Sequence, residues 1–133
     1  MIDHDHWLAA WNSADDERIL AYCTEDVEVH AVTLSARARH YRGHDGVRQW
    51  LLDVRERFRA RSYADSLERL DDDTLVMSGV LYLRSETGSE LIEQSFAMLF
   101  KLRDDEAAWI ATFVNAEEAR DMWRRGIAGP GAG

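Results

Sequence analysis

The first half of the chain carries apolar residues at the spacing of amphipathic helices. Trp7 and Trp11 are four positions apart within residues 2–12, so they share one face of a first helix. Asp15 is suited to cap a short second helix, whose apolar side is made by Ile19, Leu20 and Cys23. Residues 45–59 form the clearest helix, with an apolar stripe made by Val47, Trp50, Leu51, Val54 and Phe58. We expect its solvent-exposed face to carry the charged residues Arg48, Asp53, Arg55, Glu56 and Arg57.

The rest of the chain alternates with the period of strands. Residues 27–32 predict a short strand with Val27 and Val29 on one side and Glu28 and His30 on the other, followed by a polar loop through Arg42 and Gly43. Tight turns join four further strands and favour an antiparallel meander of residues 62–70, 74–85, 90–103 and 107–115. Both faces of residues 96–100 are apolar, so one packs on the helices and the other is expected to meet a second subunit.

The C-terminal part predicts one more helix and then a tail. Asn115 followed by Glu118 has the pattern of a capping box, which predicts a short helix through about Arg125. Residues 126–133 are rich in glycine and are expected to be disordered. The sequence therefore indicates an α+β domain over residues 1–125, with about three N-terminal helices and a curved antiparallel sheet that wraps around the long helix.

Composition and charge narrow the possible functions. The 133 residues include 46% hydrophobic residues and carry a net charge of −9, which argues against nucleic acid and anionic membranes as partners. A single cysteine excludes an internal disulfide framework and a thiolate metal cage. No apolar run exceeds five residues, so we expect no membrane span and a cytoplasmic location.

Four stretches together resemble one known superfamily. They are residues 11–15 (WNSAD), 41–48 (YRGHDGVR), 96–100 (FAMLF) and 113–119 (FVNAEEA). In order and spacing they are similar to the SnoaL-like branch of the nuclear transport factor 2-like superfamily, over about residues 4–122. This resemblance implies a cone-shaped fold with a deep, mostly apolar pocket. Members of the superfamily include ketosteroid isomerases, polyketide cyclases, epoxide hydrolases and dehydratases, and also proteins that only bind or dimerise, so the fold does not select a reaction.

The resemblance also implies that polar pocket groups have been lost. The positions that carry the Tyr, the base and the protonated Asp in steroid isomerases of this fold are Trp7, Ala31 and Met98 here, which argues against steroid isomerisation. The branch's R-x-E pattern falls on Trp109 and Ala111. The later Asp of the branch is Asn115 in this chain.

These replacements predict an apolar, aromatic-lined pocket for a small hydrophobic molecule. The lining residues expected from the pattern are Trp7, Trp11, Trp50, Gln94, Phe96, Met98, Trp109 and Phe113. The alternative is that the same side chains fill the cone. We expect no cofactor. We also expect no metal, because His4 and His6 lie at a terminus expected to be mobile, and Gly43 prevents one helix from presenting both His40 and His44 on one face.

Two residues remain as catalytic candidates. An unperturbed histidine titrates near neutral pH, which makes His30 an acid–base candidate, but strand alternation also allows it to point away from the cavity. Asn115 has the chemistry to polarise a ligand carbonyl, and the helix cap is the competing explanation for it. The two hypotheses are an enzyme of proton transfer, cyclisation or hydration, and a non-catalytic binding or dimerisation module, with a homodimer through the outer sheet face in either case.

Overall fold

A computed structural model describes residues 2–31, 39–56, 60–84 and 91–126. The helices are α1 (His4–Asn12), α2 (Asp16–Leu20), α3 (Gly43–Glu56) and α4 (Ala116–Arg124). The strands are β1 (Cys23–Ala31), β2 (Arg39–Arg42), β3 (Ala60–Asp71), β4 (Thr74–Arg84), β5 (Leu91–Arg103) and β6 (Glu106–Phe113). The α+β class is confirmed. Of the expected tail only Gly126 is among the described residues, and no helix within these ranges is long and apolar enough to cross a membrane.

The six strands form one mixed sheet in the order β2-β1-β6-β5-β4-β3. The meander predicted from the second half of the sequence is confirmed, since β3, β4, β5 and β6 pair antiparallel in succession. The parallel pairing of β1 with β6 joins segments far apart in the chain, and no local pattern indicates it. β2 falls within the segment expected to be a loop, because pairing with β1 orders a polar stretch that has no strand signal of its own.

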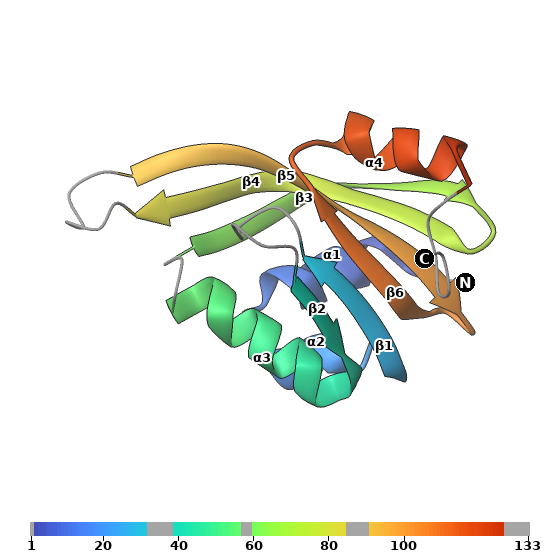
Figure 1. The fold of residues 1–133 in the computed structure, drawn as a ribbon, viewed down its shortest axis with the longest axis horizontal. Helices are drawn as coiled ribbons and strands as arrows, with labels where there is room; N and C mark the ends of the chain where they lie inside the picture. Colours follow the sequence, from blue (N-terminus) through green and yellow to red (C-terminus); the bar gives the residue numbers. More distant parts are fainter. Residues whose placement is uncertain (1, 32–38, 57–59, 85–90, 127–133) are drawn as a thin grey trace.

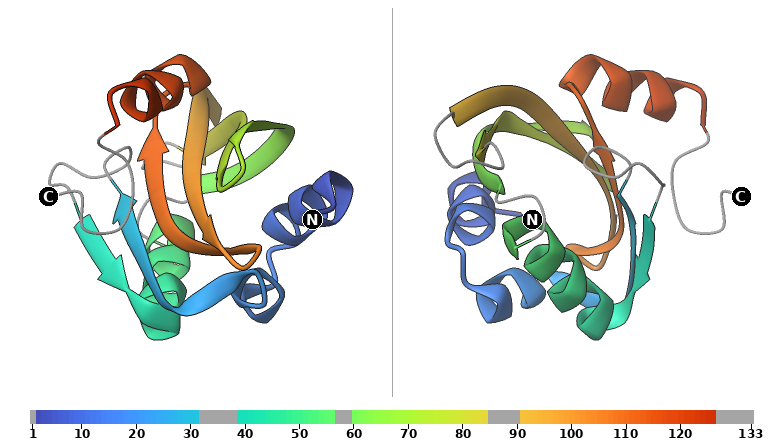
Figure 2. Two further views of the ribbon diagram at one scale, coloured as in Figure 1. Left: turned by 90° about the vertical axis from the view of Figure 1, so that its right-hand side faces the viewer. Right: turned by 60° about the vertical axis from the view of Figure 1, so that its left-hand side comes forward.

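Helices cover both faces of the curved sheet. α1, α2 and α3 lie on the concave face, and α4 lies on the convex face (Figures 1 and 2). The alternation of β5 divides its apolar residues, so that Phe96, Met98 and Phe100 belong to the concave core and Ala97 and Leu99 to the convex one. The second apolar face, which was expected to meet another subunit, is therefore covered over Ala97 and Leu99 by α4 of the same chain.

Two predicted helix caps are confirmed. Asp15 accepts hydrogen bonds from the backbone N–H groups of Glu17 and Arg18, and Asn115 accepts one from that of Glu118. The second helix is shorter than predicted and ends before Cys23, which begins β1. Cys23 is still a buried apolar residue, so its burial was predicted correctly from the pattern while its secondary structure was not.

Candidate functional site

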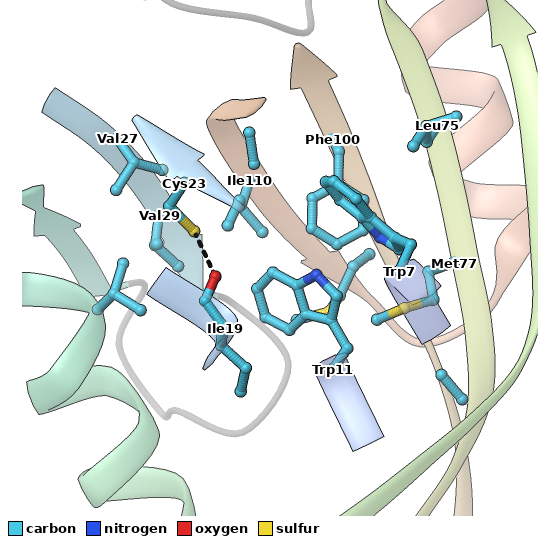
Figure 3. Packing of buried hydrophobic residues seen from close by; sticks show 14 of the residues in the cluster. Trp7, Trp11, Ile19, Cys23, Val27, Val29, Leu75, Met77, Phe100 and Ile110 are labelled. Carbon is cyan, nitrogen blue, oxygen red and sulfur yellow. Dashed lines mark hydrogen bonds between the residues drawn. The ribbon is translucent and has the colours of Figure 1, made fainter. Parts of the chain in front are cut away.

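The concave core is an aromatic cluster. Trp7 meets Phe100 edge to face, with ring centroids 5.1 Å apart. Trp11 lies 5.2 Å from Phe100 and 6.3 Å from Trp50 of α3. Figure 3 shows both indoles of α1 between the strands and the other helices. The spacing of four residues in α1 places both tryptophans on the face that meets the sheet, as the sequence predicted.

Two polar atoms in this cluster lack partners. The indole Nε1 atoms of Trp7 and Trp11 are buried, and neither has a hydrogen-bond partner among the described residues. A buried donor without a partner costs about 1–3 kcal/mol, and most such groups in proteins are paired. A ligand with a hydrogen-bond acceptor near these atoms would recover that free energy, which makes the two indoles the candidate recognition groups of the concave core.

The structure brings together most of the predicted pocket residues. Trp7, Trp11, Trp50, Phe96 and Met98 are all buried in the concave core. Gln94 is half-buried, and the alternation of β5 places it on the same face as Phe96 and Met98. The register of β4 and β5 agrees, because Gln94 lies opposite Leu81 of the concave core.

Trp109 and Phe113 lie on the opposite face of the sheet. Phe113 pairs with Ala97, and Trp109 pairs with Lys101, so alternation in β6 turns Ile110 toward the concave core instead. Both aromatic side chains belong to the convex cluster beneath α4. The eight residues predicted to line one pocket are thus split between the two sides of the sheet, because a strand with apolar residues on both faces gives no sequence signal for which face is inside.

A cavity of about 480 Å³ lies at the edge of the sheet where α1 meets β3. Its lining residues are Asn12, Arg61, Ser62, Tyr63, Tyr82, Arg84 and Leu91. This volume is within the range of small-molecule sites. None of the predicted pocket residues lines it, although Asn12 directly follows Trp11 in the chain.

His30 is on the convex side of β1. Its ring stacks on His40 of β2 with centroids 4.3 Å apart, and it lies 5.3 Å from the ring of Trp109. Val27 and Val29, which alternate with it, point into the concave core. Burial and the neighbouring charge of His40 lower the pKa of His30, against the opposing effect of Glu28. The sheet therefore separates His30 from the concave aromatic cluster, beside which the catalytic prediction had placed it.

Glu28 completes a polar group around the two histidines. His40 Nε2 lies 3.3 Å from Glu28 Oε1, and Arg42 donates a hydrogen bond of 3.1 Å to the same oxygen. One ligand-type atom from each of Glu28, His30 and His40 lies within 4.8 Å of the others. The expectation that the histidines offer no metal site considered only pairs close in sequence, whereas this cluster is formed across two strands.

The remaining candidate and one missed residue have structural partners. Asn115 Oδ1 caps α4 through the Glu118 N–H at 2.9 Å. Asp53, expected on the solvent-exposed face of α3, is 8% exposed. Its carboxylate accepts hydrogen bonds from the Tyr41 hydroxyl and from Gln49, each 2.8 Å long. Asp53 follows Trp50 by three residues, and this spacing indicates that the two share the buried face of α3. The sequence interpretation placed Asp53 on the exposed face because it is charged.

Comparisons with known proteins agree on the fold. The family described as a SnoaL-like domain matches residues 4–110. No curated protein matches the chain significantly. Three similar solved structures have TM-scores of 0.67–0.69 with this chain, which supports a shared fold. Their sequence identities are too low to support more than that.

The first is TerC co-crystallised with polyporic acid, at 19% identity over 90% of this chain and 93% of that one, with a TM-score of 0.69. The second is an NTF2-like protein of unknown function from Burkholderia pseudomallei, at 17% identity over 87% and 91%, with a TM-score of 0.69. The third, from Catenulispora acidiphila, has a ketosteroid isomerase-like fold and is in complex with trimethylamine. It shares 12% identity over 84% and 83%, with a TM-score of 0.67.

Proposed function

The chain belongs to the SnoaL-like domain family, and we propose that it binds a small hydrophobic molecule carrying a carbonyl or similar acceptor on the concave side of its sheet. Trp7 and Trp11 provide the indole N–H donors, and the surrounding aromatic rings provide the apolar contact. The observation that carries this proposal is the pair of buried Nε1 atoms that have no hydrogen-bond partner in the described part of the chain. TerC with polyporic acid and the Catenulispora protein with trimethylamine support small-molecule binding as a use of this fold.

Binding is favoured over catalysis by the candidate residues. His30 lies on the convex side, and Asn115 is engaged as a helix cap. Asp53 accepts two hydrogen bonds, which stabilise the carboxylate in a structural role between α3 and β2. Proton transfer, cyclisation or hydration by the predicted residues would need one of these groups to face the bound molecule.

The proposal is tested with fluorenone and fluorene, two probes of nearly the same shape that differ by one carbonyl group. Binding is measured by quenching of tryptophan fluorescence. We expect fluorenone to bind about two- to twelvefold more tightly, since one recovered hydrogen bond is worth about 0.5–1.5 kcal/mol and 1.4 kcal/mol is a factor of ten. Equal affinities for the two probes, or binding of neither, would contradict the proposal.

Variants then locate the donors. The double variant Trp7→Phe/Trp11→Phe removes both N–H groups, keeps aromatic rings in the core, and should abolish the preference for fluorenone. Trp123→Phe is the matched control, because Trp123 lies on the convex side in α4 and donates to Asp71. A preference that survives in the double variant would place the donor elsewhere.

Native mass spectrometry of the purified protein separates binding from catalysis. A small molecule that is retained, and then recovered unchanged after incubation, supports a binding module. Conversion of that molecule to a product would exclude this function and restore the enzymatic alternative.

A further inference from the structure

Strand pairing brings two histidines and one glutamate together on the convex face. His30 of β1 lies directly opposite His40 of β2 in the antiparallel register. Glu28 precedes His30 by two residues and therefore shares its face of β1. Three ligand-type side chains thus project from adjacent positions of two paired strands, and the backbone fixes their spacing.

From this geometry we propose that Glu28, His30 and His40 form a binding site for a divalent transition metal ion such as Zn²⁺ or Co²⁺. One donor atom from each side chain lies within 4.8 Å of the others. Donors bound to one Zn²⁺ at about 2.0–2.2 Å are about 3–3.5 Å apart. Small side-chain rotations close this difference, and no change in strand pairing is needed.

The donor set selects the class of metal. Imidazole nitrogen suits Zn²⁺, Co²⁺, Ni²⁺ and Cu²⁺, whereas Mg²⁺ and Ca²⁺ prefer oxygen ligands. Two histidines and one carboxylate supply three protein ligands, which leaves a coordination position for water or an exogenous group. The site lies on the other side of the sheet from the aromatic core, so it does not depend on the proposed small-molecule site.

The surroundings of the cluster favour a site that is accessible yet ordered. Glu28 is 19% exposed and His40 is 48% exposed, so a metal ion can reach the cluster from solvent. Trp109 packs against the His30 ring and restricts its orientation. Arg42 competes with a metal, since its guanidinium already contacts Glu28 Oε1, but its side chain is 71% exposed and can turn into solvent.

Metal binding would have a defined consequence for the fold. β2 has four residues and lies at the edge of the sheet, where β1 is its one neighbour among the described strands. A metal ion held by Glu28 and His30 on one strand and by His40 on the other would link β2 to β1 by coordination bonds. Because the ion binds the folded chain preferentially, it should raise the melting temperature.

The test uses the full chain without an affinity tag, after treatment with a chelator. Co²⁺ is added while visible absorption is recorded, and Zn²⁺ is then added to displace it. We expect one Co²⁺ per chain, displacement by Zn²⁺ and no displacement by Mg²⁺. His40→Ala, His30→Ala and Glu28→Gln each remove a ligand and should weaken Co²⁺ binding by at least about tenfold, since loss of a partner outside the coordination sphere already costs about 10–100-fold. Arg42→Gln should strengthen Co²⁺ binding, because it removes the guanidinium that competes for Glu28. The Arg42 side chain is exposed, so its replacement should not disturb the fold.

Two other histidine-containing segments provide matched controls. His6 lies near Asp3 in the first turn of α1, and His44 of α3 contacts the carbonyl oxygen of Cys23 at 3.2 Å. His6→Ala and His44→Ala should leave Co²⁺ affinity unchanged. Circular dichroism verifies that each variant is folded, and His40→Gln serves as a second, milder change at the exposed ligand.

Three results would overturn the proposal. The first is the absence of Co²⁺ binding by the wild-type chain at millimolar concentration. The second is wild-type affinity in folded His30→Ala and His40→Ala variants. The third is loss of binding in His6→Ala, which would assign the metal to the N-terminal segment.

Discussion

Asn12 at the end of α1 forms two hydrogen bonds with the backbone of Ala64 in β3. Its Nδ2 donates to the Ala64 carbonyl oxygen and its Oδ1 accepts from the Ala64 N–H, each at 2.8 Å. The register of β3 and β4 shifts between Ala64 and Ser66. The amide of Asn12 thus serves as a substitute strand partner at an irregular point of the edge strand.

We expect Asn12→Ala to destabilise the protein by about 1–3 kcal/mol. The variant leaves a partly buried N–H and a partly buried C=O without partners. Urea unfolding followed by circular dichroism measures the loss. Asn115→Ala is the matched control, since it removes an exposed helix cap and should cost about 1 kcal/mol. An Asn12→Ala variant as stable as the wild type would show that water replaces the amide without penalty.

The neighbourhood of this contact was only partly visible in the sequence. The segment around Asn12 was identified through its resemblance to a family, but nothing local connects it to a residue 52 positions away. Gly79 is similar, because a Cβ added there would lie 2.7 Å from the Cα of Ala64. Close approaches of this kind depend on tertiary pairing, which hydrophobic periodicity does not encode.

In the candidate site, too, local patterns were predicted correctly from the sequence and tertiary pairing was not. Alternation within β1 correctly separated Val27 and Val29 from Glu28 and His30. It did not indicate which face is concave, and so Trp109 was combined with residues from the other side of the sheet. The pairing of His30 with His40 depends on β2, a mostly polar strand that pairs with β1.

Cys23 is predicted to be unreactive while the protein is folded. Its thiol is buried, and burial together with the charge of Glu106 raises its pKa to about 12. Because the thiolate is the reactive form, we expect negligible reaction with a disulfide reagent at pH 8 and complete reaction after unfolding in urea. Rapid reaction of the native protein would show that the segment from α2 to β1 opens readily.

The raised pKa of Cys23 also predicts a pH dependence of stability. The folded state holds the proton more tightly than the unfolded state, whose thiol has a pKa near its ordinary value of 9.0. The stabilising contribution is therefore present below pH 9 and is lost as the pH rises toward 12. Urea unfolding at pH 8 and at pH 10 measures how much stability is lost as the pH rises. This loss should be smaller for Cys23→Ala than for the wild type.

Asp71 is predicted to help hold α4 on the convex face. Trp123 Nε1 of α4 donates to Asp71 Oδ2 at 2.7 Å. Burial raises the pKa of Asp71, but hydrogen bonds from Asp73, Thr74 and Trp123 outweigh it and bring the pKa well below the ordinary value of 3.8. The stabilising contribution is thus present above about pH 4 and is lost as the pH falls below it.

Asp71→Asn tests this contact. The variant should lower the melting temperature at pH 6 and narrow the difference in melting temperature between pH 6 and pH 3. Asp72→Asn is the control at an exposed neighbouring residue. Equal pH dependence in the wild type and Asp71→Asn would exclude the Asp71 carboxylate as the source of acid sensitivity.

A homodimer through the outer sheet face remains a prediction, now confined to the part that α4 does not cover. Tyr63 of β3 and Leu91 of β5 are 57% and 59% exposed. The strand registers place them on the convex face, opposite Val80 and Arg84 of β4. Light scattering at micromolar to submillimolar concentration should give twice the chain mass for the wild type and the monomer mass for Leu91→Asp. Leu52→Asp changes an exposed leucine of α3 and should leave the dimer intact. A wild-type monomer throughout this range would refute the dimer, and loss of the dimer in Leu52→Asp would place the interface on α3.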